Sequence, residues 1–172
     1  EYYDNNVAGT IRLLQAMQAA GVRRILFSST AAVYATGDGS PLTEDSPVRP
    51  ASPYGMTKLM TEHIIADAAR AGLLDYVILR YFNVAGADPQ GRSGQSTPNA
   101  THLIKLALEA ACGKRDTMTI FGDDWPTPDG TGVRDFIHVS DLAQAHVMCA
   151  DHLAQGRGNA VFNCGYGRGY SV

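Results

Sequence analysis

Apolar residues along the chain follow two spacings, one typical of helices and one typical of short buried strands. Val7, Ile11 and Leu14 recur every three or four positions and predict a helix over residues 5–20, followed by a strand over 24–28. The same patterns predict helices over 53–71, 100–112 and 140–154, and strands over 75–81, 119–122, 135–139 and 160–164. This alternation with short connections is typical of an α/β fold with a doubly wound parallel sheet.

Two long segments interrupt this alternation and are rich in Gly, Pro and Ser. Residues 36–53 and 83–99 both have this composition and predict surface loops. At the end of the first loop, Ser52 is a good helix N-cap and Pro53 suits the first helical position. We therefore expect a helix to begin at Pro53.

The composition narrows the class of protein. The chain has 172 residues, of which 45% are hydrophobic, and is long enough to form a hydrophobic core. A net charge of -3 argues against a nucleic-acid partner, and the preference for arginine over lysine favours fixed anion contacts. Three widely spaced cysteines and the lack of a long apolar run predict a reduced, cytoplasmic protein without a metal site or a membrane span. Because residue 1 is Glu, we expect an internal segment of a longer chain.

One pair of side chains suggests chemistry. Tyr54 and Lys58 are four positions apart near the start of a predicted helix, so both lie on one face. Spacing alone is weak, because about one chain in seven of this composition has such a pair by chance. The hydroxyl run 28–30 strengthens the case, since it ends a predicted strand at the sheet edge where α/β proteins bind ligands. Thr30, Tyr54 and Lys58 then form a candidate catalytic triad.

A tyrosine beside a lysine can carry a proton near neutral pH. A free phenol titrates near about 10, so a useful base needs a pKa about 3 units lower, which corresponds to roughly 4 kcal/mol. One cation about 4 Å away supplies roughly that energy at an effective dielectric of about 20. We therefore expect Lys58 to lower the pKa of Tyr54, while Thr30 holds the hydroxyl of the substrate.

Three further segments carry a resemblance to a known family. They are residues 2–10, residues 80–87 (Arg-Tyr-Phe-Asn-Val-Ala-Gly-Ala) and residues 129–143, which contain Gly-Thr-Gly-Val-Arg-Asp. Together with the Tyr54–Lys58 pair and the hydroxyl run, they resemble the UDP-glucose 4-epimerases of the extended short-chain dehydrogenase/reductase superfamily. The resemblance covers essentially every residue in order, and the Gly-Thr-Gly-Val-Arg-Asp segment is highly specific.

The resemblance implies an NAD-dependent isomerase of nucleotide-sugar metabolism. Tyr54 would take the proton of the sugar 4-hydroxyl while NAD takes the hydride from C4. The oxidised nicotinamide would help Lys58 to lower the pKa of the Tyr54 phenol. The resulting 4-keto sugar would turn about its diphosphate link, and return of the hydride would invert C4. The implied NAD contacts are Asn5, Thr30, Tyr54, Lys58 and Phe82. The implied UDP-sugar contacts are Thr30, Tyr54, Asn83, His102, Leu103, Thr119, Ile120, Phe121 and Arg134.

The resemblance also implies a division of roles along the chain. Residues 1–83 would be the C-terminal half of an NAD-binding Rossmann domain that carries the triad. Residues 84–172 would form much of a small UDP-sugar-binding region, with 133–155 returning to the Rossmann domain. The Gly-rich dinucleotide loop should lie upstream of residue 1, and the residues that control tolerance of N-acetylated sugars should lie beyond residue 172. A homodimer is compatible with the resemblance.

Several of these residues have simpler interpretations. Asn83 could stabilise a loop through an Asx turn, and His102 could simply begin a helix. Arg134 could be a structural ion-pair partner of Asp135 or Asp141. These alternatives need no ligand.

Aromatic and charged residues outside the triad also have structural interpretations. Phe82 and Phe121 are core aromatics on sequence grounds alone, and His138 is interpreted as a satisfied core histidine. The remaining candidates are carboxylates interpreted as solvated loop residues and not as a metal site: Asp38, Asp123 and Asp124.

Other functions remain open beside the epimerase. A 4,6-dehydratase of the same superfamily would need an acidic pair where this chain has Ala31 and Ala32, which argues against dehydration. An epimerase or decarboxylase of UDP-glucuronate is a second alternative. The third is a non-catalytic fragment, because the phosphate-binding loop is expected to lie outside the chain.

Overall fold

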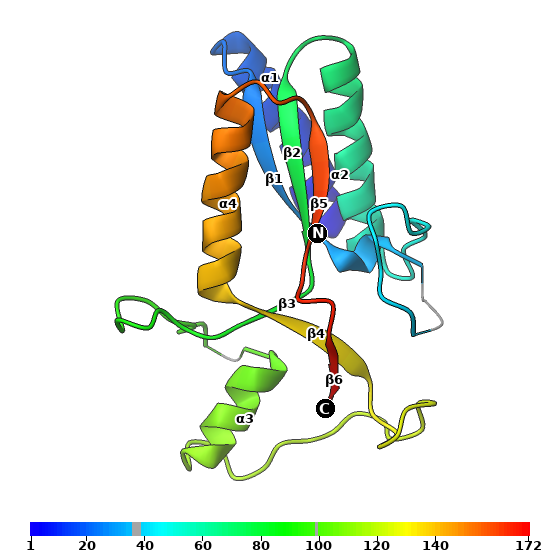
Figure 1. The fold of residues 1–172 in the computed structure, drawn as a ribbon, viewed down its shortest axis with the longest axis vertical. Helices are drawn as coiled ribbons and strands as arrows, with labels where there is room; N and C mark the ends of the chain where they lie inside the picture. The colour runs from blue at the N-terminus through cyan, green and yellow to red at the C-terminus, as the bar shows by residue number, and fades with distance from the viewer. Residues whose placement is uncertain (36–38, 99) are drawn as a thin grey trace. The chain divides into compact units, whose positions relative to one another are not determined.

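The chain divides into two compact units in a computed structural model that describes residues 1–35, 39–98 and 100–172 (Figure 1). The first unit comprises Glu1–Phe82 and Ala145–Cys164, and the second comprises Asn83–Gln144 and Gly165–Val172. The NAD-binding and UDP-sugar-binding roles expected for the two parts of the sequence stay predictions.

A three-stranded parallel sheet forms the centre of the first unit. Its strands follow the order β1-β2-β5 and are β1 (Arg24–Thr30), β2 (Asp75–Tyr81) and β5 (Ala160–Cys164). β1 and β2 pair along their whole length, from Arg24 opposite Asp75 to Thr30 opposite Tyr81. All three strands are parallel, so their carboxyl ends meet at one edge. This arrangement confirms the predicted α/β, Rossmann-like sheet.

Helices cover both faces of this sheet. α2 (Pro53–Arg70) lies on one face and the first-unit part of α4 (Val139–Ala154) on the other (Figure 1). Successive side chains of a strand point to opposite faces. Accordingly, Ser29 of β1 donates a hydrogen bond to Glu62 of α2, whereas the hydroxyl of Ser28 lies 3.4 Å from a histidine nitrogen of α4. The layers are those of a doubly wound fold.

Local sequence explains where the first helices begin. The helix predicted over 5–20 is present as a π-helical turn, Tyr3–Ala8, followed by α1 (Gly9–Ala19). The predicted start of α2 is confirmed, because Ser52 Oγ accepts a hydrogen bond from the Gly55 N–H at 3.1 Å. This cap satisfies one of the free N–H groups at the helix end that carries Tyr54 and Lys58.

Aliphatic side chains of β2, of α2 and of the turn after β1 are the best buried. Val77, Ile78 and Leu79 of β2 each expose at most 1% of their surface, and Ile65 and Val33 expose none. β2 is therefore a central strand buried on both faces, as its continuous apolar run predicts. The shared core holds α2 and the turn after β1 against the sheet.

A small mixed sheet organises the second unit. β3 (Asn83–Ala85) pairs in parallel with β4 (Val133–His138), and β4 pairs antiparallel with β6 (Gly169–Ser171). The helix of this unit before β4 is α3 (Leu103–Ala111). β3 and β6 were missed by the sequence prediction because strands of three residues carry no detectable alternation.

The strand predicted over 119–122 is wrong. These four residues form no strand and are exposed, with 90% of the surface of Phe121 accessible. A short apolar run can have the composition of a buried strand, but only pairing with a neighbour makes it one. The other predicted strands and helices are present; β2 and β5 match at both ends, and the rest have boundaries shifted by at most three residues.

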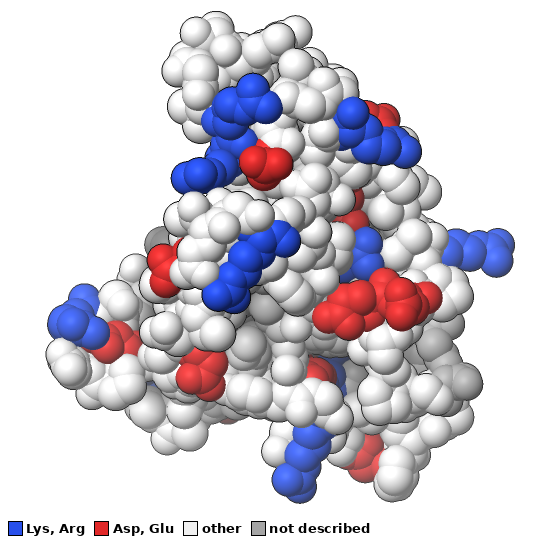
Figure 2. Space-filling view, turned by 45° about the horizontal axis from the view of Figure 1, so that its top comes forward, with Lys and Arg blue, Asp and Glu red and all other residues white. Residues whose placement is uncertain are grey.

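Charged side chains are spread over the surface. On the face shown in Figure 2, basic and acidic side chains are interspersed among a mostly uncharged surface. Anion binding on that face would therefore depend on individual cations. None of the helices in the described ranges is long and apolar enough to cross a membrane.

Candidate active site

The carboxyl edge of the first-unit sheet brings the predicted triad together. Thr30 is the last residue of β1, and Tyr54 and Lys58 lie in the first turns of α2. The Thr30 side chain lies close enough to the phenol of Tyr54 to lower its pKa. Lys58 Nζ donates a hydrogen bond to the backbone oxygen of Ser28 at 3.0 Å. Each member of the triad therefore has a contact that ties α2 to the end of β1.

The pKa of Tyr54 is raised, which is opposite to the direction expected from the sequence. Burial of the phenol is the largest cause, the Thr30 hydrogen bond lowers the pKa in part, and Tyr81 and Tyr2 raise it further. Lys58 is not among the groups that shift this pKa. Burial also lowers the pKa of Lys58, because the charged ammonium loses hydration. The expected lowering of the Tyr54 pKa is therefore absent in the chain by itself, where burial outweighs the other effects. Its lowering by Lys58 together with an oxidised nicotinamide stays a prediction.

Two tyrosines that sequence reasoning missed surround the phenol. The ring of Tyr2 lies 5.7 Å from that of Tyr54, measured between centroids, with an interplanar angle of 57°. Tyr81 ends β2 opposite Thr30, and its ring lies 6.3 Å from that of His146. The position of Tyr81 at the end of a predicted strand could have indicated that it lies at the site. No feature of the sequence around Tyr2 indicates this.

Gly55 is a further residue that sequence reasoning missed. A Cβ at this position would lie 2.3 Å from the backbone oxygen of Ala32 and 3.0 Å from Pro50 Cβ. Only glycine therefore allows the start of α2 to approach the turn after β1 this closely. The approach places Tyr54, the preceding residue, beside Thr30.

The two remaining predicted NAD contacts of the first unit are Asn5 and Phe82, and both make backbone hydrogen bonds. Asn5 is exposed on the π-helical turn, and its N–H donates to the Glu1 oxygen at 2.9 Å. Phe82 follows β2, is partly buried, and donates its N–H to the Cys164 oxygen at 3.3 Å. The side chain that anchors the turn to α2 is Asn6, whose amide donates to the Thr57 hydroxyl at 2.9 Å.

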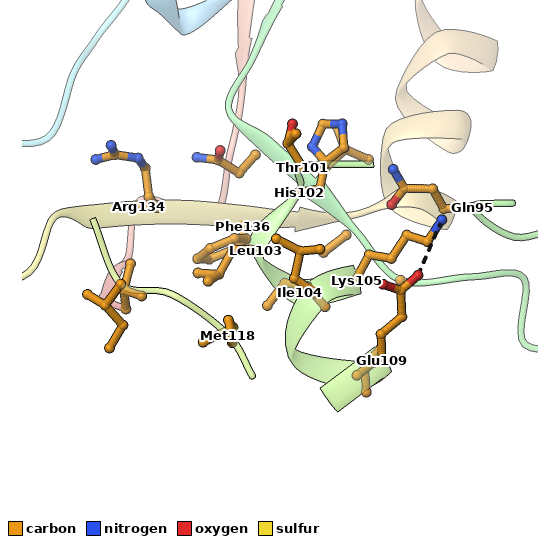
Figure 3. A pocket seen from close by; sticks show the side chains of 18 of the residues that line it. Gln95, Thr101, His102, Leu103, Ile104, Lys105, Glu109, Met118, Arg134 and Phe136 are labelled. Atoms are coloured by element: carbon orange, nitrogen blue, oxygen red, sulfur yellow. Dashed lines mark ion pairs between the residues drawn. The ribbon is translucent and has the colours of Figure 1, made fainter. Parts of the chain in front are cut away.

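In the second unit, one pocket collects the other predicted residues. Its volume is about 950 Å³, and it is formed by β3, β4, α3 and the segment after α3 (Figure 3). All seven predicted substrate contacts of this unit line it: Asn83, His102, Leu103, Thr119, Ile120, Phe121 and Arg134. Leu103 and Phe136 form part of an apolar floor, and Arg134 projects from β4 (Figure 3). A pocket that combines an apolar surface with polar and charged side chains suits an organic ligand that carries both kinds of group.

Arg134 does not form the structural ion pair that was its alternative. Its Nη1 donates to the neighbouring Val133 oxygen at 2.9 Å, and within the described residues it makes no ion pair. Asp135 instead accepts hydrogen bonds from the N–H groups of Tyr166 and Gly167, at 3.1 and 2.8 Å. Most guanidinium donors of Arg134 thus remain available for an anion.

The other alternative interpretations have mixed outcomes. The Asn83 amide donates to the Asp135 oxygen at 3.4 Å across the β3–β4 pair, not within an Asx turn. His102 occupies the position before the first residue of α3 and caps it with no side-chain bond. His138 Nδ1 accepts a hydrogen bond from the Ser140 N–H at 3.1 Å, as a satisfied structural histidine does.

The Gly-Thr-Gly segment before Arg134 is stabilised by one carboxylate. Asp129 accepts hydrogen bonds from the N–H and the hydroxyl of Thr131, at 2.9 and 2.8 Å. Hydrogen bonds from Ser171 first, and then from Thr131, lower the pKa of Asp129 to about 2. A Cβ on Gly130 would lie 2.0 Å from the Asp123 oxygen, so the turn requires glycine there.

The carboxylates interpreted as solvated lie partly outside the described residues. Asp38 is one of the residues that the structure does not describe, whereas Asp123 and Asp124 are exposed. Among the described residues, no group of three His, Cys, Asp or Glu side chains is arranged to hold a metal ion.

Known proteins resemble the chain along its whole length. The NAD dependent epimerase/dehydratase family matches residues 1–165. A UDP-glucose 4-epimerase of Azospirillum brasilense is 57% identical over 172 residues, which are 100% of this chain and 49% of that protein. The chain thus spans about half the length of the curated relatives that it matches.

Solved structures match the fold equally well. The UDP-glucose 4-epimerase from Brucella ovis in complex with NAD is 47% identical with a TM-score of 0.94, covering 99% of this chain and 53% of that one. The UDP-glucose 4-epimerase from Bifidobacterium longum in complex with NAD+ and UDP is 42% identical with a TM-score of 0.92, covering 99% of this chain and 52% of that one.

Proposed function

Because the chain belongs to the NAD dependent epimerase/dehydratase family, we propose that its full-length protein interconverts UDP-glucose and UDP-galactose by inverting C4. The observation that carries this proposal is the cluster at the carboxyl edge of the first-unit sheet. There the Thr30 side chain lies beside the Tyr54 phenol, and Lys58 donates a hydrogen bond to the backbone of Ser28. A phenol, a hydroxyl and an ammonium held together suit proton transfer coupled to loss of a hydride.

The donors at this edge fit NAD. Lys58 uses one of its three ammonium donors on Ser28, so its other donors can bind the diol of a ribose. NAD would accept the hydride from C4 of the sugar and return it. The proposed NAD contacts are Asn5, Thr30, Tyr54, Lys58 and Phe82.

Tyr54 is the proposed proton carrier. It would accept the proton of the 4-hydroxyl as the hydride leaves C4, which gives a 4-keto sugar, and would return the proton to O4 when the hydride adds to the other face. Thr30 would hold the 4-hydroxyl and share its proton. Since burial raises the pKa of Tyr54, its action as a base near neutral pH needs the positive charges of Lys58 and the oxidised nicotinamide.

The pocket of the second unit is the proposed site for the nucleotide. The available guanidinium donors of Arg134 suit paired hydrogen bonds to a diphosphate. The exposed apolar surface of Phe121 suits contact with a uracil ring. The remaining proposed UDP-sugar contacts in this pocket are Asn83, His102, Leu103, Thr119 and Ile120.

The proposal is tested with the NAD-loaded full-length protein. We expect UDP-glucose to be converted into a mixture with UDP-galactose, identified by the C4 configuration in NMR spectra, without net formation of NADH. Stoichiometric release of NADH would indicate a dehydrogenase, and a product that has lost water would indicate a dehydratase. Either result, or no change at C4, would overturn the proposal.

Two broader expectations belong to this proposal. Association of two copies of the full-length protein is expected and is measured by light scattering. A cytoplasmic location rests on the three cysteines, which are all free. Recovery of the protein outside the cytoplasm on cell fractionation would contradict that expectation.

A further inference from the structure

A second polar cluster lies inside the first unit, beside the residues assigned to the proposed reaction. Arg80 of β2 and Glu62 of α2 form an ion pair in which Arg80 Nη2 lies 2.6 Å from Glu62 Oε2. Arg80 Nε lies 3.1 and 3.2 Å from the two carboxylate oxygens. Only 9% of the Arg80 side chain and 6% of the Glu62 side chain are exposed. Ser29 of β1 also donates its hydroxyl hydrogen bond to Glu62.

Arg80 extends this cluster to Tyr34 and, through it, to Asn163 of β5. Its Nη1 donates to the Tyr34 hydroxyl at 3.0 Å, and that hydroxyl donates to Asn163 Oδ1 at 2.6 Å. The connected side chains thus come from β1, α2, β2 and β5, and from Tyr34, which follows the 3₁₀ turn Ala31–Val33. Among the described residues, no buried side-chain polar atom lacks a hydrogen-bond partner. The network is complete without a ligand.

The spacing of Glu62 connects the network with the proposed chemistry. Glu62 is four residues after Lys58 and eight after Tyr54, so the three side chains lie along one face of α2. Glu62 is bonded to Ser29, and Lys58 is bonded to Ser28, the preceding residue. Tyr54 lies beside Thr30, the residue after Ser29. The bond between Ser29 and Glu62 therefore restricts the rotation of α2 about its axis and its position along β1.

The energetics of a buried ion pair favour a role of Glu62 and Arg80 in positioning α2 over a role in stabilising the fold. Removing two charges from water costs several kcal/mol per ion in proteins, and apolar pairs of similar volume are often as stable or more so. Fixed hydrogen bonds between Glu62 and two strands, however, admit only one register of α2. Apolar packing alone would allow small sliding and rotation of the helix.

We propose that Glu62, held by Arg80 and Ser29, is a positioning residue that fixes Tyr54 and Lys58 for proton transfer. The inference rests on the proposed function of the triad. A misplacement of about 1 Å can cost about 100-fold in rate. Loss of the Glu62 bonds should therefore lower kcat, whereas KM for UDP-glucose should stay near that of the wild type, because nucleotide contacts are assigned to the second unit.

The test compares three variants of the NAD-loaded full-length protein. Ser29→Ala removes one bond to Glu62 with little change in volume, and we expect kcat to fall about tenfold. The double variant Glu62→Leu/Arg80→Met replaces the pair by apolar side chains and should fold, with kcat about 100-fold lower. Asp67→Asn removes the exposed ion pair with Arg70 on the same helix and is the control. Turnover is expressed per folded, NAD-loaded enzyme, and thermal midpoints are measured in parallel.

The outcomes separate positioning from stability. Lower kcat in Ser29→Ala, with KM within about twofold and the control like the wild type, supports the proposal. A lowered thermal midpoint with unchanged kcat per folded enzyme shows a role in stability alone and overturns it. If the double variant fails to fold, Ser29→Ala decides the question by itself. If the wild type does not interconvert the sugars, the proposed function fails first; if it does and Ser29→Ala equals it, only the positioning role fails.

Discussion

The two units differ in how far their own contacts define a site. In the first unit, Tyr54 lies beside Thr30 and Lys58 donates a hydrogen bond to Ser28 without any ligand. In the second unit the predicted residues line one pocket, yet Arg134 is bonded to the adjacent Val133 oxygen and Phe121 is 90% exposed. Contacts between β1 and α2 hold the chemical groups of the first unit in place, whereas the pocket of the second unit supplies groups that a ligand has to bring into contact.

Tyr54→Phe is expected to have the largest effect, because it removes the proposed proton carrier and leaves the ring in place. General acid–base catalysis contributes about 10²- to 10⁴-fold, so we expect kcat to fall by that factor. The measurement is turnover of UDP-glucose by the NAD-loaded full-length protein. Tyr76→Phe, which changes a partly buried tyrosine near the start of β2, is the control. Turnover by Tyr54→Phe within a few-fold of the control would show that the assigned role is wrong.

Lys58→Met tests whether the ammonium tunes the phenol. Removing a cation raises the pKa of a neighbouring phenol, so the rising limb of the pH–rate profile should move to higher pH. We also expect kcat at neutral pH to fall about 100-fold. Arg70→Met removes an exposed cation from the same helix and should leave the profile unchanged. A rising limb at the same pH as in the wild type would contradict the coupling between Lys58 and the phenol. It would mean that burial, which raises the pKa of Tyr54 in the structure, decides that pKa.

Gly55→Ala tests the close approach of α2 to the turn after β1. The added Cβ would lie 2.3 Å from the Ala32 oxygen, so the start of α2 must shift and carry Tyr54 with it. We expect kcat to fall about tenfold. Gly9→Ala is the matched control, because its Cβ would lie 3.7 Å from the nearest atom, the Asp4 oxygen. Equal turnover in the two variants would show that this approach does not position the phenol.

Asp129→Asn should have the smallest effect and should concern the second unit only. The folded-state pKa of Asp129 is about 2, below its usual 3.8, because hydrogen bonds from Ser171 and Thr131 favour the carboxylate. Its stabilisation is therefore present above about pH 4 and is lost as the pH falls through about 2. We expect a slightly lower thermal midpoint at neutral pH and a difference that shrinks as the pH falls toward 2. Asp123→Asn is the control, and an equal change there would refute the role of Asp129.

Much of the fold follows from the sequence, and the failures have physical reasons. The predicted strands over 75–81 and 160–164 match β2 and β5 at both ends, because each is a short apolar run bounded by turn residues. The strand over 119–122 fails because strand formation depends on a partner that local composition does not reveal.

The candidate site divides in the same way. Thr30, Tyr54 and Lys58 could be found because hydroxyl, phenol and ammonium stand at positions that the topology brings to one edge. The direction of the Tyr54 pKa shift could not be predicted from the sequence, because it depends on how deeply the phenol is buried. The partnership of Glu62 with Arg80 also depends on which strand α2 packs against, and no spacing within either element indicates it.

The division of roles between the units is tested most directly by calorimetric titration of UDP into the NAD-loaded Tyr54→Phe and Arg134→Ala proteins. Loss of a charge-assisted hydrogen-bonding group costs about 1.5–3 kcal/mol, so Arg134→Ala should bind UDP at least about tenfold more weakly than the wild type. Tyr54→Phe should bind UDP like the wild type although it has lost its turnover. Equal weakening in both variants, or weakening in Tyr54→Phe alone, would contradict the assignment of chemistry to the first unit and nucleotide recognition to the second.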